Sequence, residues 1–162
     1  MTEQAHNQTP PFCDTYMVIE PHTQPVTNKD RAADYKRQLR ETFSLEGKDL
    51  GPLIDRFVDK NMESATISLP SNAKRGYVID YNREQAKCVE NNPFGWDDWF
   101  DKYPKTFCFI YVSRPVYDAA NGLLLIYIGR QSSERSGIYY IALYEYKEGK
   151  FKELKIDEQL VS

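Results

Sequence analysis

The sequence predicts an α+β domain in which two N-terminal helices and a short tryptophan-rich helix pack on a mainly antiparallel, meander-type β-sheet. Two observations predict this class. Apolar residues recur at helical spacing up to about residue 60 and alternate with polar residues from Ala65 onward. From residue 106 to the C-terminus, apolar stretches of strand length are separated by turn-forming dipeptides. We expect one soluble domain over residues 30–162, preceded by an arm over residues 1–29.

The arm is rich in proline and in polar residues. Its prolines are Pro10, Pro11, Pro21 and Pro25, and they lie among Gln, Thr and Asn. Proline fixes φ and removes a backbone donor, so this composition predicts a mostly extended segment. Only Tyr16 to Ile19 is apolar enough to form a short strand or a lid against the core.

Two amphipathic helices are expected after the arm. The first, near residues 30–43, collects apolar residues on one face: Ala32, Tyr35, Leu39 and Phe43. The second, near residues 49–61, tolerates Pro52 in its first turn. Its apolar stripe consists of Leu50, Leu53, Ile54, Phe57 and Val58.

The rest of the chain is expected to form strands. Two of them are predicted over residues 65–69 and 76–81, while residues 82–92 show no clear pattern. Four more are predicted near residues 106–113, 123–129, 138–146 and 150–156. The dipeptides that mark the turns are Asn121-Gly122, Ser136-Gly137 and Glu148-Gly149.

The distribution of apolar residues predicts where these strands lie in the sheet. Residues 106–113 and 123–129 are apolar on both faces, which is typical of central strands that are covered on both sides. Residues 150–156 are half polar, so we expect this last strand at an edge.

A short helix is predicted after Asn92 and Pro93, because aromatic residues follow at helical spacing: Trp96, Trp99, Phe100 and Tyr103. These aromatics could form a platform for a ligand, but we prefer a plug that lays two indoles over the sheet. Three acidic residues on the polar side, Asp97, Asp98 and Asp101, could act on a glycoside or hold a divalent cation. The helix dipole favours acidic residues there in any case.

Charge and cysteine content restrict the class of protein. The net charge is −3, from 21 basic and 24 acidic residues that are interspersed, which argues against a nucleic-acid partner. No apolar run approaches the ~18 residues of a membrane span. The N-terminus lacks the features of a signal peptide, so the chain is cytoplasmic as written and periplasmic if a signal peptide was removed. The spacing of Cys13, Cys88 and Cys108 fits neither zinc nor a disulfide scaffold, although one bridge is possible in an oxidising compartment.

Histidine is found only in the arm, at His6 and His22. The predicted domain therefore offers no imidazole as a base, as the partner of a nucleophile or as a metal ligand. No phosphate-binding glycine loop, dinucleotide fingerprint or calcium loop occurs. We predict a protein without a cofactor, without a metal and without catalytic activity.

The most unusual polar stretch lies between Gly129 and Gly137, and we interpret it as a loop between two apolar strands. Two arginines with serine hydroxyls could bind an anion or a partner's carboxylate there. Arg114, at the end of a predicted strand, could bind an anion or a carboxylate in the same way. The candidate partner-binding residues are Arg114, Arg130, Ser132, Ser133, Glu134 and Arg135.

Several short motifs resemble a group of small uncharacterised bacterial proteins of unknown function, which are often exported or lipoproteins. The matching motifs are Phe57 to Asn61, Trp99-Phe100, Tyr103-Pro104, Val112 to Pro115, Leu124 to Gly129, Gly137 to Tyr140, Gly149 to Phe151 and Val161-Ser162. The sequence departs from the group at Phe151, where Trp is usual, and at residues 132–136, which lack its Gly or Cys content. The resemblance implies a domain type and an exported origin, and it names no catalytic residues.

Two functions remain. The first is a non-catalytic protein-binding module, such as an immunity protein that neutralises a bacterial toxin or effector, and an acidic chain would suit a basic partner. The alternative is a small-molecule-binding or enzymatic domain with the helix–sheet pocket of the nuclear transport factor 2-like folds. In that case Asp80, flanked by Tyr77 and Tyr81, would serve the pocket.

Overall fold

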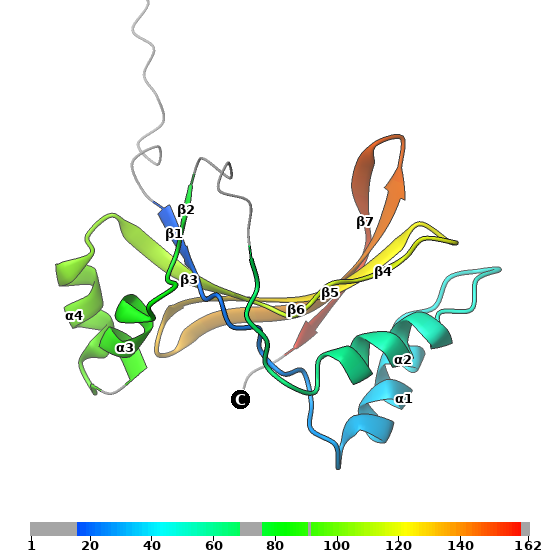
Figure 1. The fold of residues 1–162 in the computed structure, drawn as a ribbon, viewed down its shortest axis with the longest axis horizontal. Helices are drawn as coiled ribbons and strands as arrows, with labels where there is room; N and C mark the ends of the chain where they lie inside the picture. The colour runs from blue at the N-terminus through cyan, green and yellow to red at the C-terminus, as the bar shows by residue number, and fades with distance from the viewer. Residues whose placement is uncertain (1–15, 69–75, 91, 160–162) are drawn as a thin grey trace, which may run out of the picture.

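The computed structural model describes residues 16–68, 76–90 and 92–159, which form four helices and a seven-stranded sheet (Figure 1). The helices are α1 (Ala32–Thr42), α2 (Gly51–Lys60), α3 (Glu84–Glu90) and α4 (Gly95–Lys102). The strands are β1 (Tyr16–Ile19), β2 (Tyr77–Ile79), β3 (Thr106–Val112), β4 (Val116–Asp118), β5 (Leu123–Ser133), β6 (Ser136–Lys147) and β7 (Lys150–Gln159). The α+β class and the predominance of antiparallel pairs are confirmed.

The strand order is β2-β1-β3-β5-β6-β7, and β4 pairs with β5 outside this path. The pairs β3–β5, β4–β5, β5–β6 and β6–β7 are antiparallel. However, β1 runs parallel to both of its neighbours, so the sheet is mixed. The prediction of an edge position for the last strand is confirmed, because β7 ends the order.

The predicted arm contains a central strand, β1, whose bounds, Tyr16–Ile19, are those of the short apolar stretch that the sequence indicated as a strand or a lid. β1 lies between β2 and β3, and Val18 pairs with Val78 on one side and Phe109 on the other. The residues that follow it stay on the domain, since the Glu20 amide donates to the Ile110 carbonyl and the Thr23 amide to the Ala65 carbonyl. Proline content suggested an extended arm, but extended backbone is also what a short strand and its continuation need. Residues 1–15 of the arm lie outside the described residues.

Two further local predictions need correction. Residues 65–68 form no regular strand, and Thr66 makes only an isolated bridge with His22; residue 69, the end of that predicted strand, is not among the described ones. The unassigned stretch over residues 82–92 contains helix α3, of which only Gln85 and Ala86 are buried. Two adjacent buried residues make no stripe at helical spacing, so the pattern gave no signal.

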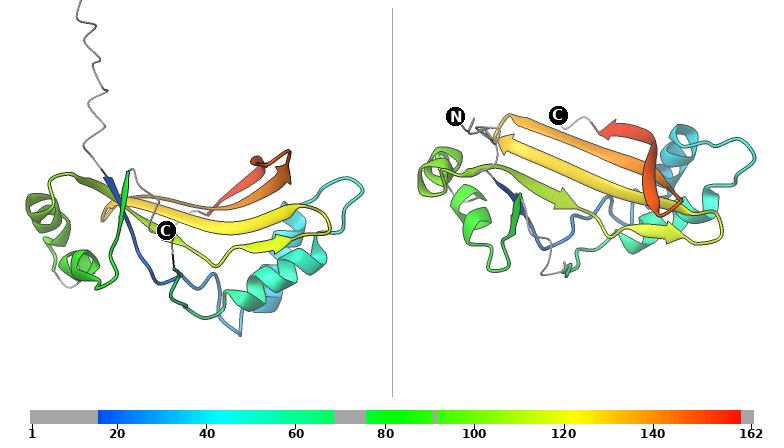
Figure 2. Two further views of the ribbon diagram at one scale, coloured as in Figure 1. Left: turned by 45° about the horizontal axis from the view of Figure 1, so that its top comes forward. Right: turned by 90° about the horizontal axis from the view of Figure 1, so that it is seen from above.

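Both helix pairs cover the same face of the sheet, at opposite ends of its long strands (Figures 1 and 2). α1 and α2 pack over β4, β5 and β6, in a core that includes Phe43, Phe57, Leu125 and Ile141. α3 and α4 pack over β1 and β3, in a second core built from Val18, Ala86, Trp99 and Phe109. The register places Phe109 opposite Gln131, which shares its side of β5 with Leu125, so both cores lie on one side.

No described helix covers the opposite side of the sheet, which we call the uncovered face (Figure 2). Its side chains alternate with those of the two cores along each strand, and they include the charged residues Arg130, Glu153 and Glu158. Most of the others are apolar or aromatic: Ile110, Val112, Tyr117, Leu124, Ile126, Ile128, Ile138, Tyr140, Tyr144, Tyr146, Phe151 and Ile156. The prediction that residues 106–113 and 123–129 form central strands is confirmed, because β3 and β5 both lie inside the strand order. The expectation that both of their faces are covered is not met in the described part of the chain, where helices pack on one side only.

A tryptophan anchors the second helix pair. Trp99 is fully buried, its ring centroid lies 4.6 Å from that of Phe109, and its Nε1–H donates to Gln85 Oε1 at 2.9 Å. This hydrogen bond satisfies the one polar group of the indole and ties α4 to α3. Gly95, the first residue of α4, is buried against the end of α3, where an added Cβ would lie 2.6 Å from the Val89 carbonyl oxygen.

We predict that Gly95→Ala destabilises the domain by about 1–3 kcal/mol, because the new methyl group would overlap backbone atoms that cannot move alone. The matched control is Gly51→Ala, at the first position of α2. The atoms nearest to an added Cβ there belong to the side chains of Asp49 and Arg40, at 3.0 and 3.6 Å, so a small shift of side chains and not of backbone accommodates the methyl group. Urea denaturation of the two variants is the measurement, and equal midpoints would show that α3 and α4 are not in close contact.

Candidate functional site

The predicted loop between Gly129 and Gly137 is mostly a continuation of two strands. β5 extends to Ser133 and β6 begins at Ser136, which leaves only Glu134 and Arg135 in the turn. Gly129 and Gly137, which suggested the ends of a loop, lie within the two strands for a steric reason. A Cβ on Gly129 or Gly137 would lie 2.5 or 2.8 Å from ring carbons of Tyr139, so both glycines make room for this ring.

The candidate arginines are found in separate surroundings. The backbone amide of Arg114 donates to Asn61 Oδ1 at 2.8 Å, and its guanidinium donates to the Lys60 carbonyl at the end of α2. A cation at this end is favoured by the helix dipole, so Arg114 acts as a C-terminal cap. Arg130 lies on β5, with its guanidinium 5.6 Å from the ring centroid of Phe107. The structure does not bring these two arginines together with the turn.

The remaining candidates gather at the turn between β5 and β6. The hydroxyl of Ser132 lies 3.3 Å from that of Ser136, and the Arg135 amide donates to Ser133 Oγ at 3.3 Å. This turn lies against the start of α4, and together they line an open surface pocket of about 240 Å³. Its lining joins two stretches that the sequence had marked separately: Pro93, Phe94, Trp96 and Asp97 from the tryptophan helix, and Ser133, Glu134 and Arg135 from the turn.

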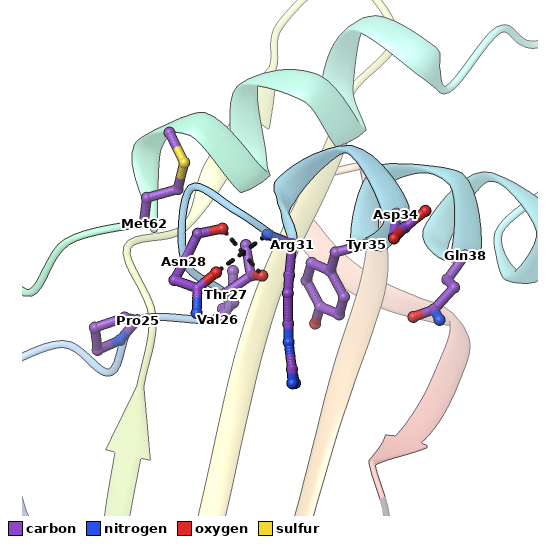
Figure 3. Close-up of a pocket in the computed structure, with 9 residues that line it drawn as sticks. All are labelled: Pro25, Val26, Thr27, Asn28, Arg31, Asp34, Tyr35, Gln38 and Met62. Atoms are coloured by element: carbon purple, nitrogen blue, oxygen red, sulfur yellow. Dashed lines mark hydrogen bonds between the residues drawn. The ribbon is translucent and has the colours of Figure 1, made fainter.

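A larger pocket of about 800 Å³ lies beside the N-terminal half of α1 (Figure 3). Its polar wall is formed by Asn28, Arg31, Asp34, Tyr35 and Gln38, and its apolar wall includes Val26 and Met62. Figure 3 shows the side chains of Arg31 and Tyr35 lying next to each other and pointing away from the helix. None of these residues was a candidate from the sequence, where Tyr35 counted only as part of an apolar stripe.

Tyrosines lie on the helix-covered face of β3, β5 and β6. The rings of Tyr127 and Tyr139 are stacked at 6.3 Å, and the Tyr139 hydroxyl donates to Gln131 Oε1 at 3.1 Å. Burial, with a smaller contribution from Tyr139, raises the pKa of Tyr127 to about 12. Burial also raises the pKa of Tyr111 and that of Tyr35. These phenols keep their protons even at a pH where an exposed tyrosine ionises, and among them only the Tyr139 hydroxyl has a hydrogen-bond acceptor in the described part of the chain.

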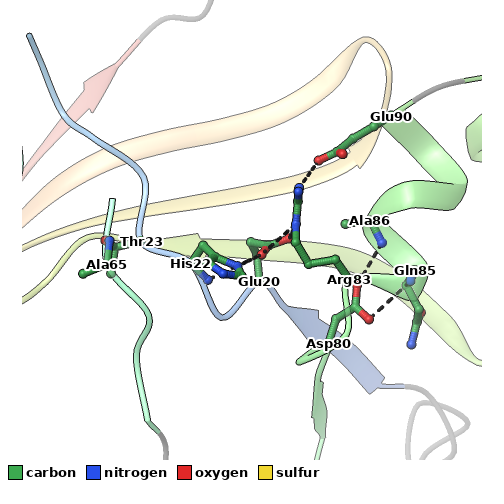
Figure 4. Close-up of polar contacts among 9 residues, drawn as sticks. All are labelled: Glu20, His22, Thr23, Ala65, Asp80, Arg83, Gln85, Ala86 and Glu90. Atoms are coloured by element: carbon green, nitrogen blue, oxygen red, sulfur yellow. Dashed lines mark hydrogen bonds and ion pairs between the residues drawn. The ribbon is translucent and has the colours of Figure 1, made fainter. Parts of the chain in front are cut away.

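A buried carboxylate connects the segment after β1 to α3 (Figure 4). Glu20 is 2% exposed, and its Oε1 lies 2.9 Å from Nδ1 of His22 and 3.4 Å from Nε of Arg83. Arg83 also pairs with Glu90, the last residue of α3. This cluster corrects the expectation that His22 lies apart from the domain, whereas His6 lies outside the described residues. The His22 ring has Glu20 as its hydrogen-bond partner in the described part of the chain, so no nucleophile is paired with it there.

Arg83, which pairs with both carboxylates of this cluster, has an unfavourable backbone conformation. Its φ is 54°, which costs a residue other than glycine about 1–2 kcal/mol. The two ion pairs of its guanidinium offset this cost, because a buried carboxylate such as Glu20 needs a positive partner.

Asp80, the candidate of the pocket alternative, caps a helix. Its carboxylate accepts hydrogen bonds from the amides of Gln85 at 3.3 Å and Ala86 at 2.8 Å, at the start of α3 (Figure 4). Tyr81 next to it is 56% exposed, and Tyr77 is half-buried in β2. Asp80 lines neither of the two pockets described above.

Two further observations concern the described residues only. They contain no group of three His, Cys, Asp or Glu side chains arranged to hold a metal ion, and no helix among them has the length and apolar content to cross a membrane. Cys88 and Cys108 are free thiols, and burial raises the pKa of Cys108. Cys13 lies outside the described residues.

Comparisons with protein-family models, with curated proteins and with solved structures find no match for this chain. The resemblance to small exported bacterial proteins stays a prediction.

We predict that Arg83→Met lowers the free energy of unfolding by about 1–2 kcal/mol, since it leaves the buried carboxylate of Glu20 without its guanidinium partner, and the 37% exposure of Arg83 keeps the loss below that of a fully buried pair. The double variant Glu20→Gln/Arg83→Met should recover most of this loss, because a neutral amide does not need a cation. Denaturant unfolding at pH 7 measures both.

The control is Arg37→Met, which breaks the surface ion pair between Arg37 and Asp34. The side chains of these two residues are 67% and 68% exposed. We expect little change from it, since exposed ion pairs contribute little. Equal losses in Arg37→Met and Arg83→Met would contradict a special role for the buried pair.

Proposed function

We propose that this chain is a non-catalytic protein-binding module and that its partner covers the uncovered face of the sheet. The observation that supports the proposal is the composition of this face. An antiparallel sheet with one face in water normally alternates apolar and polar residues. Here β5 carries Leu124, Ile126 and Ile128 on the side away from the helices, between Leu123, Leu125 and Tyr127 on the packed side.

The exposed apolar area on this face is larger than an isolated surface residue would give. Tyr117, Tyr146 and Phe151 form a contiguous aromatic cluster, with the Phe151 ring centroid 6.4 Å from that of Tyr117 and 5.0 Å from that of Tyr146. They are 42%, 45% and 53% exposed. An aromatic side chain has about 150–250 Å² to bury, so the three together expose on the order of 300 Å².

Other exposed apolar side chains lie on the same face: Ile138, near the turn between β5 and β6, is 58% exposed, and Ile156 on β7 is 38% exposed. The aromatic cluster alone corresponds to the lower end of the range of about 300–600 Å² for the largest apolar patches on monomeric proteins, which often mark interfaces. A standard interface buries about 800 Å² on each partner. The uncovered face would supply the apolar centre of such an interface.

The more specific form of the proposal is an inhibitor of the immunity-protein kind, which neutralises a toxin or effector by occupying its surface. The net charge of −3 supports a basic partner, because opposite charges accelerate association. Neither helix pair blocks the proposed interface, since both lie on the other side of the sheet (Figure 2).

The proposal is tested by photo-crosslinking in cells that express the chain. The reactive residue p-benzoylphenylalanine replaces Phe151 or Ile138 on the uncovered face, and Arg37 on α1 as the control position. We expect both face positions to give an adduct with the same host protein, identified by mass spectrometry, and the control position to give none. With that protein purified, the double substitution Tyr146→Glu/Phe151→Glu should weaken binding about 100-fold, as expected for two aromatic anchors.

The melting temperature of the double variant should stay close to that of the wild type, because both side chains are exposed. An adduct formed only with a second copy of this chain would contradict a heterologous partner. If neither face position gave an adduct while the control position reacted, the uncovered face would be excluded as the interface.

The pocket beside α1 supports a second candidate function, which is the binding of a small molecule. Its volume of about 800 Å³ lies within the range of about 300–1,000 Å³ that is typical of ligand sites. The polar groups of Arg31, Tyr35 and Gln38 line this pocket and would offer hydrogen bonds to a ligand. Binding of this kind should be lost in Arg31→Met and retained in Phe151→Glu, whereas binding of a partner to the uncovered face should show the reverse.

A further inference from the structure

The pocket between α4 and the β5–β6 turn combines two aromatic side chains with two carboxylates. Phe94 and Trp96 come from the start of α4, next to Asp97, and Glu134 comes from the turn. Phe94 is 67% exposed, although its backbone is fixed by two hydrogen bonds, from its amide to Asn92 Oδ1 and from the Asp98 amide to its carbonyl. A large apolar side chain held at a defined place in water is available for contact with a ligand.

The second aromatic wall is rigid. Trp96 is partly buried, and its ring stands nearly perpendicular to Trp99 and Phe109, at centroid distances of 5.4 and 5.8 Å. Such edge-to-face contacts are favourable and hold the indole in one orientation. The pocket therefore requires little ordering of its aromatic side before a ligand binds.

The charges at the pocket favour a cation. In the described part of the chain, the side chains of Asp97 and Glu134 take part in no ion pair, so their carboxylates are not neutralised. Opposed to them are Arg135 and the N-terminus of α4, whose dipole corresponds to about half a positive charge. The negative charges outweigh the positive ones.

We propose that this pocket binds an organic cation, namely an ammonium or guanidinium group. Aromatic rings attract cations through the negative charge on their faces, and carboxylates add direct Coulomb attraction. A volume of about 240 Å³ accommodates one cationic head group and part of its alkyl stem. The cation could be a free small molecule or the end of a lysine or arginine side chain. This site does not depend on the proposed interface, because it lies beside α4 and not on the uncovered face.

The chain contains its own reporters for this site. Its only two tryptophans are Trp96, in the pocket, and Trp99, which is fully buried and donates to Gln85. In a ¹⁵N-labelled protein, their two indole N–H signals distinguish binding at the pocket from a general salt effect. The probes are tetramethylammonium chloride, Nα-acetyl-lysine methylamide and Nα-acetyl-arginine methylamide, each titrated against sodium chloride at equal ionic strength.

We expect the Trp96 signal to shift saturably with the organic cations, with dissociation constants on the order of millimolar, and not with sodium. Tighter binding of the lysine or arginine derivative than of tetramethylammonium would identify a side chain as the source of the cation. The opposite order would identify a free quaternary ammonium compound. Both orders support the proposal, because the chemistry at the pocket is the same.

Substitutions decide the sign of the ligand charge. Asp97→Asn and Glu134→Gln should each weaken cation binding about fivefold, and Phe94→Leu should weaken it by removing one ring. Arg135→Gln should strengthen it about threefold, because it removes the like charge. The control is Asp101→Asn, an exposed acidic residue on the same helix that does not line the pocket, and it should change affinity little.

Three results would overturn the proposal. The first is the absence of a saturable Trp96 shift with any of the three cations. The second is equal weakening by Asp101→Asn and Asp97→Asn, which would indicate nonspecific attraction to the acidic helix. The third is saturable binding of acetate that is lost in Arg135→Gln, which would show that the pocket is an anion site.

Discussion

The length of the central hairpin determines the arrangement of the other elements. β5 and β6 have 11 and 12 residues, which corresponds to about 37 Å, whereas the 11 residues of α1 span only about 16 Å. One helix pair therefore covers only part of the packed face. The fold places α1 and α2 over one end and α3 and α4 over the other, each with its own core. Because the helices are shorter than the strands, part of the packed face between the two cores has no helix above it.

Polar and amphipathic side chains occupy the surface between the two helical ends. A tyrosine ring can pack on the sheet while its hydroxyl finds a partner, as Tyr139 does with Gln131. Gly129 and Gly137 are part of this solution, because the Tyr139 ring lies where their side chains would be. The negative charge of Glu20 is buried and therefore needs a positive partner. Arg83, at the start of α3, supplies this charge. This ion pair thus fixes the position of a helix that contributes few apolar contacts of its own.

The sequence predicted an element correctly where its residue pattern is compatible with only one kind of structure. The stripes of α1 and α2, the turn at Asn121-Gly122 and the edge position of β7 follow from periodicity and turn chemistry. The wrong predictions concern patterns that are compatible with two different structures. Glycines that make room for Tyr139 look like loop ends, and prolines around β1 look like an arm. The polar cluster of Glu20, His22 and Arg83 joins residues that are far apart in the chain, and no local pattern encodes it. The pocket at the β5–β6 turn was not predicted, because its two stretches stood out separately in the sequence and their contact is tertiary.

The place of β1 has a consequence for how the chain folds during synthesis. This strand leaves the ribosome early, yet its two partners are β2 and β3, which are made much later. Pairs between such distant segments raise the contact order and slow folding. The hairpins of β5, β6 and β7, by contrast, can close from neighbouring segments. We therefore expect the C-terminal hairpins to form locally and β1 to join last, between two strands that run in its own direction. Until then the edge of β3 is open, and a chaperone that shields an unpaired strand would assist this protein most at that stage.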